Sequence, residues 1–221
     1  MRMPTDKQAN APVFNIDPVF GKMAVVMGQA TWTIPELTQR EKCFACLAAD
    51  VCMRDLDLPF QMHVQMALAN DVPIWDIREA ILQSAVEGGH TGALMALRSF
   101  KVMCADIGQP LPQDEDASSF DSQVGYFEKT GGMDVALLKM WSPLMPTYWS
   151  RAGLSLKERA FISLTGNVLQ GVLGAAFAHH LDLARAAGAA DDQVRALFRF
   201  LSEYGSSRSW AALDALKNST R

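Results

Sequence analysis

The stretch Leu37-Thr38-Gln39-Arg40-Glu41 recurs 117 positions later as Leu154-Ser155-Leu156-Lys157-Glu158. In both copies a hydroxyl residue is followed three positions later by glutamate, a pattern typical of the first turn of an α-helix. The same offset relates further residues without a gap from Asp17 to Gly88. The pairs include Trp32 with Trp149, Phe44 with Phe161, His63 with His180 and Arg78 with Arg195. Matches this widely spread, and in rare residue types, predict two copies of one structural unit.

Each copy is predicted to be helical, because apolar residues such as Leu37, Phe44 and Leu47 recur at helical spacing. No alternating pattern longer than a few residues suggests a strand. Helix breaks are expected at residues 55–59, 71–73 and 88–89 of the first copy. In the second copy they are expected near Gly171–Gly174, at Gly188 and at Gly205. The sequence therefore predicts an all-α protein with four or five helices in each copy.

Three segments are expected along the chain. Residues 1–105 form the first repeat with an N-terminal tail, and residues 131–221 form the second repeat. Between them, residues 106–130 are rich in acidic residues, proline and serine, as is typical of a solvated linker.

Composition narrows the function classes. The 221 residues carry a net charge of −4, and 49% of them are hydrophobic, so the chain can bury a substantial core. Without a Lys/Arg-rich run, neither a nucleic-acid partner nor a membrane partner is expected. The longest apolar stretch, 168–178, is too short to span a membrane, and the N-terminal residues Met1 to Asp6 are not followed by the apolar core of a signal peptide. A cytoplasmic location is therefore expected.

The cysteines do not form an evident chemical motif. Cys43, Cys46 and Cys52 fall within ten positions of one predicted helix, which is poor geometry for disulfides. Cys43 and Cys46 are spaced like a redox or metal pair, but no second pair completes a zinc site. We interpret both as buried small side chains and expect no metal ion and no cofactor.

Several ionisable residues have both a structural and a functional interpretation. Glu41 and Glu158 either complete capping boxes or act as acids or bases in a pocket. His63 and His180 recur in one register and can move protons near neutral pH, although histidines on half-apolar helices are often structural. His90 lies at a glycine-rich junction and has no counterpart in the second copy, where the sequence continues as Ser206 and Ser207.

Three stretches of the first copy resemble the carboxymuconolactone decarboxylase family. They are Leu37 to Glu41, His63-Val64 with Ala67-Leu68, and Ile77 to Gln83 with Gly88-Gly89. The second copy resembles the same family through residues 154–158, 180–188 and 204–205. The resemblance implies an alkylhydroperoxidase D-like helical fold in two tandem repeats. It also implies a homo-oligomer, most simply a homotrimer that acts as a pseudo-hexamer.

The family has a peroxidase branch and a decarboxylase branch. The peroxidase branch requires Cys-x-x-Cys four positions before the histidine, where this chain has Leu56 and Pro59, so thiol peroxidase activity is not expected. The decarboxylase branch carries the histidine without these cysteines and releases CO2 from a lactone acid without a cofactor. Glu87, Asp71 and His90 depart from that branch and make the expected pocket more polar.

The resemblance and the residues together predict a cofactor-free lyase that acts on a small oxo-acid or lactone. His63 is predicted to be the general acid or base, Glu41 its orienting partner, and His90 a further group that contacts substrate. Arg40 or Arg78 is expected to hold a substrate carboxylate, and His180 with Glu158 would form a second or degenerate site. Other proton transfers (lactone opening, dehydration, isomerisation or cyclisation) remain open, as does a non-catalytic binding or scaffold role.

Overall fold

A computed structural model describes residues 12–111 and 134–219, and all regular elements in these ranges are helical. The first half contains α2 (Pro12–Ile16), α3 (Pro18–Trp32), α4 (Gln39–Met53), α5 (Leu58–Ala69), α6 (Ile74–Gly88) and α7 (His90–Asp106). The second half contains α8 (Val135–Trp141), α9 (Met145–Ser150), α10 (Leu156–Gln170), α11 (Ala175–Ala186), α12 (Asp191–Phe200), the 3₁₀-helix η1 (Leu201–Tyr204) and α13 (Ser206–Ser219). The all-α prediction is confirmed. Most of the predicted linker 106–130 and the first part of the predicted tail lie outside the described residues.

Helices of the two halves begin and end at the offset found in the sequence. Both bounds of α4 lie 117 positions before those of α10, and the same is true of α5 and α11. Helix α6 corresponds to α12 continued by η1. The breaks between these helices fall where the sequence predicts them, at the proline and glycine segments.

The first turns of α4 and α10 are built alike. The hydroxyls of Thr38 and Ser155 accept from the backbone N–H of Glu41 and Glu158, whose carboxylates accept from the backbone N–H of the capping residues. These reciprocal bonds satisfy groups that a helix start leaves unpaired. Helix α4 ends at Arg54 with φ 63°, and α10 ends at the corresponding Gly171 with φ 72°.

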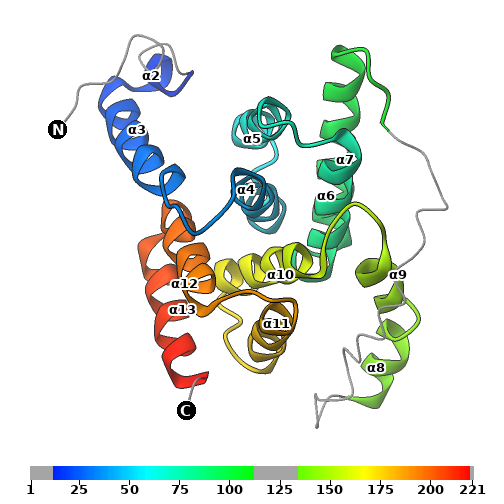
Figure 1. Cartoon of the computed structure of the whole chain (residues 1–221). Coiled ribbons are helices and arrows are strands. Elements are labelled where there is room, and N and C mark those ends of the chain that lie inside the picture. The colour runs from blue at the N-terminus through cyan, green and yellow to red at the C-terminus, as the bar shows by residue number, and fades with distance from the viewer. Residues whose placement is uncertain (1–11, 112–133, 220–221) are drawn as a thin grey trace.

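Helices α4 and α10 pack against each other at the centre of the molecule, as Figure 1 shows. Helices α5, α6 and α7 surround α4, while α11, α12 and α13 surround α10. The helix that leads into each repeat contacts the other repeat. Trp32 at the end of α3 packs edge-on against Phe200 of α12, and Tyr148 of α9 reaches His90 of α7. The two halves therefore share their interior instead of folding as separate bodies.

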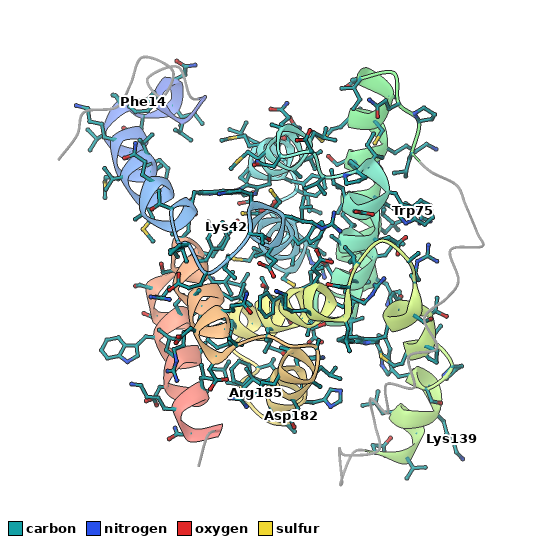
Figure 2. All side chains as sticks on the ribbon, viewed as in Figure 1. Phe14, Lys42, Trp75, Lys139, Asp182 and Arg185 are labelled. Carbon is teal, nitrogen blue, oxygen red and sulfur yellow. The ribbon has the colours of Figure 1, made fainter. Side chains whose placement is uncertain are left out.

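A buried cation lies near the start of each central helix. Lys42 of α4, labelled in Figure 2, is 1% exposed and donates from Nζ to the Trp32 carbonyl at 2.6 Å. The corresponding Arg159 of α10 is equally buried and donates to the Tyr148 and Arg151 carbonyls. Each cation thus ties a central helix to the segment that precedes it. None of the described helices combines the length and apolar character that crossing a membrane would require.

Candidate functional site

His63 on α5 is held by a buried carboxylate of α4. Its Nδ1 lies 2.7 Å from Oδ2 of Asp50, whose side chain is 1% exposed, while the His63 side chain is 17% exposed. The second oxygen of Asp50, Oδ1, is buried and has no hydrogen-bond partner among the described residues. The pair therefore combines a fixed ring orientation with partial access for the histidine.

The second repeat completes the surroundings of His63. The ring of Tyr204, in η1, lies 6.3 Å from the imidazole between ring centroids. The Tyr204 hydroxyl is buried and has no hydrogen-bond partner among the described residues, like Oδ1 of Asp50. The thiol of Cys46 lies beside both rings and contributes to the pKa of each. Near His63, two buried polar atoms, Oδ1 of Asp50 and the Tyr204 hydroxyl, have no hydrogen-bond partner among the described residues. Such atoms can form hydrogen bonds to a polar ligand or to water.

The environment of His63 favours the charged state of its ring. Burial alone would lower the pKa of His63, but interactions with Cys46 and Asp50 raise it to about 11. Burial raises the pKa of Asp50 to about 6, against the lowering effect of the hydrogen bond with His63. The raised pKa of His63 favours an imidazolium that donates from Nδ1 to the Asp50 carboxylate. An imidazolium in this position is a proton donor.

His180 on α11 repeats this geometry with a different partner. Its Nδ1 lies 2.7 Å from Oδ1 of Asn167, 117 positions after Asp50. The ring is 0% exposed and stacks on Trp149 at 5.8 Å between centroids and an interplanar angle of 17°. Burial, with His179 nearby, lowers the pKa of His180 to about 3, so its ring is neutral. This histidine is packed inside the protein.

Glu87 of the first repeat enters the surroundings of His180, just as Tyr204 of the second repeat enters those of His63. Its Oε2 accepts from Nδ2 of Asn167 at 2.8 Å, and its Oε1 lies 3.6 Å from Nε2 of His180. Burial raises the pKa of Glu87 to about 7, against the lowering effect of the Asn167 bond. Gly166 makes this approach possible, because a Cβ there would lie 2.4 Å from Cβ of Glu87.

Glu41 and Glu158 serve the start of the two central helices. Beyond its capping role, Glu41 pairs with Lys157 at 2.7 Å, and Glu158 pairs with Arg40 at 2.6 Å. The two ion pairs are related by the 117-residue offset and join α4 to α10. The predicted pairing of Glu41 with His63 is not observed, since the carboxylate that orients the ring is Asp50. The sequence left open whether these glutamates are structural or catalytic, and the capping bonds support the structural interpretation.

The arginines predicted to hold substrate are engaged in ion pairs. Arg40 donates to Glu158, to Asp76 and to the Gly153 carbonyl. Arg78 donates to Glu79 and lies over the Trp75 ring at 5.1 Å. The guanidinium groups are therefore committed to the fold.

His90 belongs to a separate exposed cluster. Its Nε2 lies 2.7 Å from the Tyr148 hydroxyl, and its ring contacts Trp141 at 5.7 Å between centroids. The structure therefore does not bring His90 into the His63 pair.

The site residues missed in the sequence carry a recognisable signal. Asp50 and Asn167 precede their histidines by 13 positions in both repeats, and Asp50 follows Cys46 by one helical turn. Tyr204 and Glu87 occupy corresponding positions of η1 and α6, just before a glycine. The recurring 13-residue spacing is a signal for Asp50 and Asn167, and the position before the glycine is one for Tyr204 and for Glu87, which the sequence had already set apart as a departure from the family.

Among the described residues, neither the cysteines nor the potential metal ligands form a redox or metal site. All four cysteines are free, and burial raises the pKa of Cys43 to about 12, which disfavours a thiolate there. Within residues 12–111 and 134–219, no group of three or more His, Cys, Asp or Glu side chains is arranged to hold a metal ion.

The fold and these contacts define an all-helical protein with two related histidine centres, each completed by a residue of the other repeat. The model of the carboxymuconolactone decarboxylase family matches residues 136–218, nearly all of α8 to α13. Residues 136–218 are therefore similar to this family, which agrees with the resemblance found in the sequence. A search among curated proteins finds no match.

Proposed function

We propose that the protein is a cofactor-free acid–base enzyme of the carboxymuconolactone decarboxylase type. Its substrate would be a small lactone or oxo-acid that carries a carboxylate, and His63 would be its proton donor. The observation that carries the proposal is the 2.7 Å contact between Nδ1 of His63 and the buried Asp50 carboxylate. A fixed and partly accessible imidazolium can donate the proton that such a reaction uses.

The chemistry consumes the proton that His63 holds. The bond from the substrate carbon to its carboxylate breaks, CO2 leaves, and the electron pair enters an enolate that extends to the lactone or oxo carbonyl. Since Nδ1 is occupied by Asp50, Nε2–H of His63 donates its proton to the carbanion carbon. The neutral ring then recovers a proton from water. Asp50 stabilises the imidazolium and fixes its orientation throughout.

The two unpartnered polar atoms near His63 support a polar ligand at this centre. Oδ1 of Asp50 and the Tyr204 hydroxyl are both buried, and an unsatisfied buried polar atom costs about 1–3 kcal/mol. Burial raises the pKa of Tyr204 well above its ordinary value, so its hydroxyl keeps its proton and can donate a hydrogen bond. We assign Tyr204 the role of a donor to the oxygen of the developing enolate.

The test is CO2 release from carboxymuconolactone and a panel of small lactone acids and oxo-acids. Wild-type protein is expected to release CO2 from at least one, and His63→Gln is expected to reduce kcat by roughly 100-fold or more. Gln65→Ala is the matched control, because Gln65 lies two positions further along α5 and is exposed. No turnover across the panel, or equal turnover by His63→Gln, would contradict the proposal and favour a binding or scaffold role.

We also propose that the chain assembles into a homo-oligomer, with a homotrimer as the simplest form. Exposed apolar side chains on α3 and on the corresponding α8 support this, among them Phe20, Met23, Val135 and Met140. Monomeric proteins rarely leave such faces uncovered. Analytical ultracentrifugation should give three times the 24.2 kDa of the chain, whereas a monomer at micromolar concentration would contradict the proposal.

A further inference from the structure

A basic groove lies at the junction of α12, η1 and α13, and its lining includes no residue of either histidine centre. Its volume is about 470 Å³, and no acidic side chain is among the residues that line it. The lining residues that carry the argument are three cations, two serines and a tryptophan: Arg195, Arg199, Lys217, Ser206, Ser209 and Trp210. The combination of positive charge, hydroxyl groups and an indole is suited to an anion.

Ser209 is the observation that points to a ligand. The residue is only 4% exposed, yet it lines the groove, and its Oγ is buried without a hydrogen-bond partner among the described residues. Buried hydroxyls in proteins are nearly always satisfied, so this one is available to an oxygen that enters the groove. Ser209 lies in the first turns of the 14-residue helix α13, at the end that attracts negative charge.

The two arginines of the groove are held only by weak, exposed ion pairs. Arg199 is half-exposed and is tied through one nitrogen to Oε1 of Glu36 at 2.9 Å. Arg195 is only loosely paired, because its Nε lies 3.9 Å from an oxygen of the highly exposed Asp192. Since exposed ion pairs contribute little, either arginine can turn to a stronger anionic partner at small cost.

Trp210 adds a flat apolar surface beside these charges. Its side chain is 76% exposed, although indoles are among the groups that gain most from being covered. An indole next to arginines is suited to a planar ring, which stacks on one face while its charged substituent meets the cations. At the corresponding junction of the first repeat, His90 instead contacts Tyr148 and Trp141. The groove is therefore a feature in which the two repeats differ.

We propose that this groove binds a small planar anion, a ring that carries a phosphate or carboxylate group. The anionic group meets Arg195, Arg199 and the Ser209 hydroxyl, and the ring stacks on Trp210. Binding here is separate from the chemistry proposed at His63, because the groove shares none of that centre's residues.

The test is calorimetric titration of the full chain with phenyl phosphate, benzoate and inorganic phosphate. The double change Arg195→Gln with Arg199→Gln is expected to weaken phenyl phosphate binding by about tenfold or more, since both charge-assisted contacts are lost. Ser209→Ala should weaken it about threefold, by one neutral hydrogen bond. Trp210→Ala should weaken phenyl phosphate about fivefold and leave inorganic phosphate almost unchanged. Comparison of phenyl phosphate with benzoate identifies which anionic group the groove prefers.

Arg185→Gln is the matched control, because Arg185 on α11 is a paired, partly exposed arginine outside the groove. It should leave all three affinities unchanged. Absence of binding by both ring compounds overturns the proposal. So does equal weakening by Arg185→Gln, or an unchanged phenyl phosphate affinity in Trp210→Ala. Circular dichroism of each variant verifies that the helical fold is retained.

Discussion

The two histidine centres have the same geometry and opposite electrostatics. Nδ1 of His63 lies 2.7 Å from Asp50, and Nδ1 of His180 lies 2.7 Å from Asn167, at positions related by one offset. Cys46 and the Asp50 carboxylate raise the pKa of His63, whereas burial lowers that of His180. The comparison teaches that the scaffold fixes where the ring lies, while the neighbouring side chains decide whether it carries a proton.

The largest effect is expected from Asp50→Asn, which gives the first centre the partner found in the second. The amide can still accept from Nδ1, so the ring orientation is kept while the charge that stabilises the imidazolium is lost. The pKa of His63 should fall and kcat for CO2 release should decrease by about 100-fold, within the range for a general acid. NMR titration of the His63 ring, together with the pH profile of kcat, measures both changes.

The converse change, Asn167→Asp, serves as the comparison. It places a second carboxylate beside Glu87, and the repulsion between like charges should make the new carboxyl harder to ionise. His180 would still be buried and out of reach of a substrate. An unchanged pKa of His63 in Asp50→Asn would show that Asp50 does not set the state of the ring.

The second centre gives stability a pH dependence of its own. Burial raises the pKa of Glu87 to about 7 from 4.5, so the folded state favours the protonated carboxyl and loses stability as pH rises from about 4.5 to 7. Glu87→Gln removes this titration. Relative to wild type, the variant should gain up to about 3 kcal/mol in unfolding free energy between pH 5 and pH 8. Urea denaturation at the two pH values measures the gain.

His180 provides the internal check on that measurement, because its lowered pKa acts in the opposite direction. A buried neutral histidine costs stability as pH falls from about 6.5 towards 3. The difference between the two proteins therefore reports the titration of Glu87 together with any change that its loss causes at His180, 3.6 Å away. A difference that stays constant from pH 5 to pH 8 would mean that Glu87 titrates normally.

The fold was more accessible from the sequence than the site. The helix breaks are local, because Pro59, Gly171 and the capping residues specify them with their own backbone and side-chain chemistry. The partner of His63 is not local: Glu41 matched the expected residue type, but its carboxylate is consumed by the helix start and by Lys157. Which carboxylate reaches a histidine depends on how α4 and α5 cross, and no spacing within one helix encodes that angle.

Packing between the repeats offers a third contrast. Gly166→Ala would place a Cβ 2.4 Å from Cβ and 2.9 Å from Cγ of Glu87, so α6 and α10 must separate or Glu87 must leave its position. We expect a loss of about 1–3 kcal/mol in unfolding free energy, as for overpacked cores. Gly174→Ala is the control, because a Cβ there meets no atom within 4 Å and Asp57 adopts similar angles at the corresponding position. Thermal unfolding measures the stability of both variants. Equal stability would contradict the prediction, because it would mean that the backbone around Gly166 relaxes without cost.

The smallest effect is expected where the two repeats exchange ion pairs. Each cation lies over an aromatic ring, Arg40 over Phe44 and Lys157 over Phe161. Arg40 also donates to Glu158, Asp76 and the Gly153 carbonyl, whereas Lys157 makes one ion pair, with Glu41. Arg40→Ala should therefore cost about 1–2 kcal/mol and Lys157→Ala less than about 1 kcal/mol, because Lys157 is partly exposed and makes only one ion pair. Glu41 keeps its bonds from Thr38 after the lysine is lost, which limits the penalty further. Urea denaturation of the two variants in low and high salt tests this ranking. A larger loss of stability in Lys157→Ala would contradict it. The contact between α4 and α10 would then depend on neutralising the buried charge of Glu41 more than on the number of hydrogen bonds.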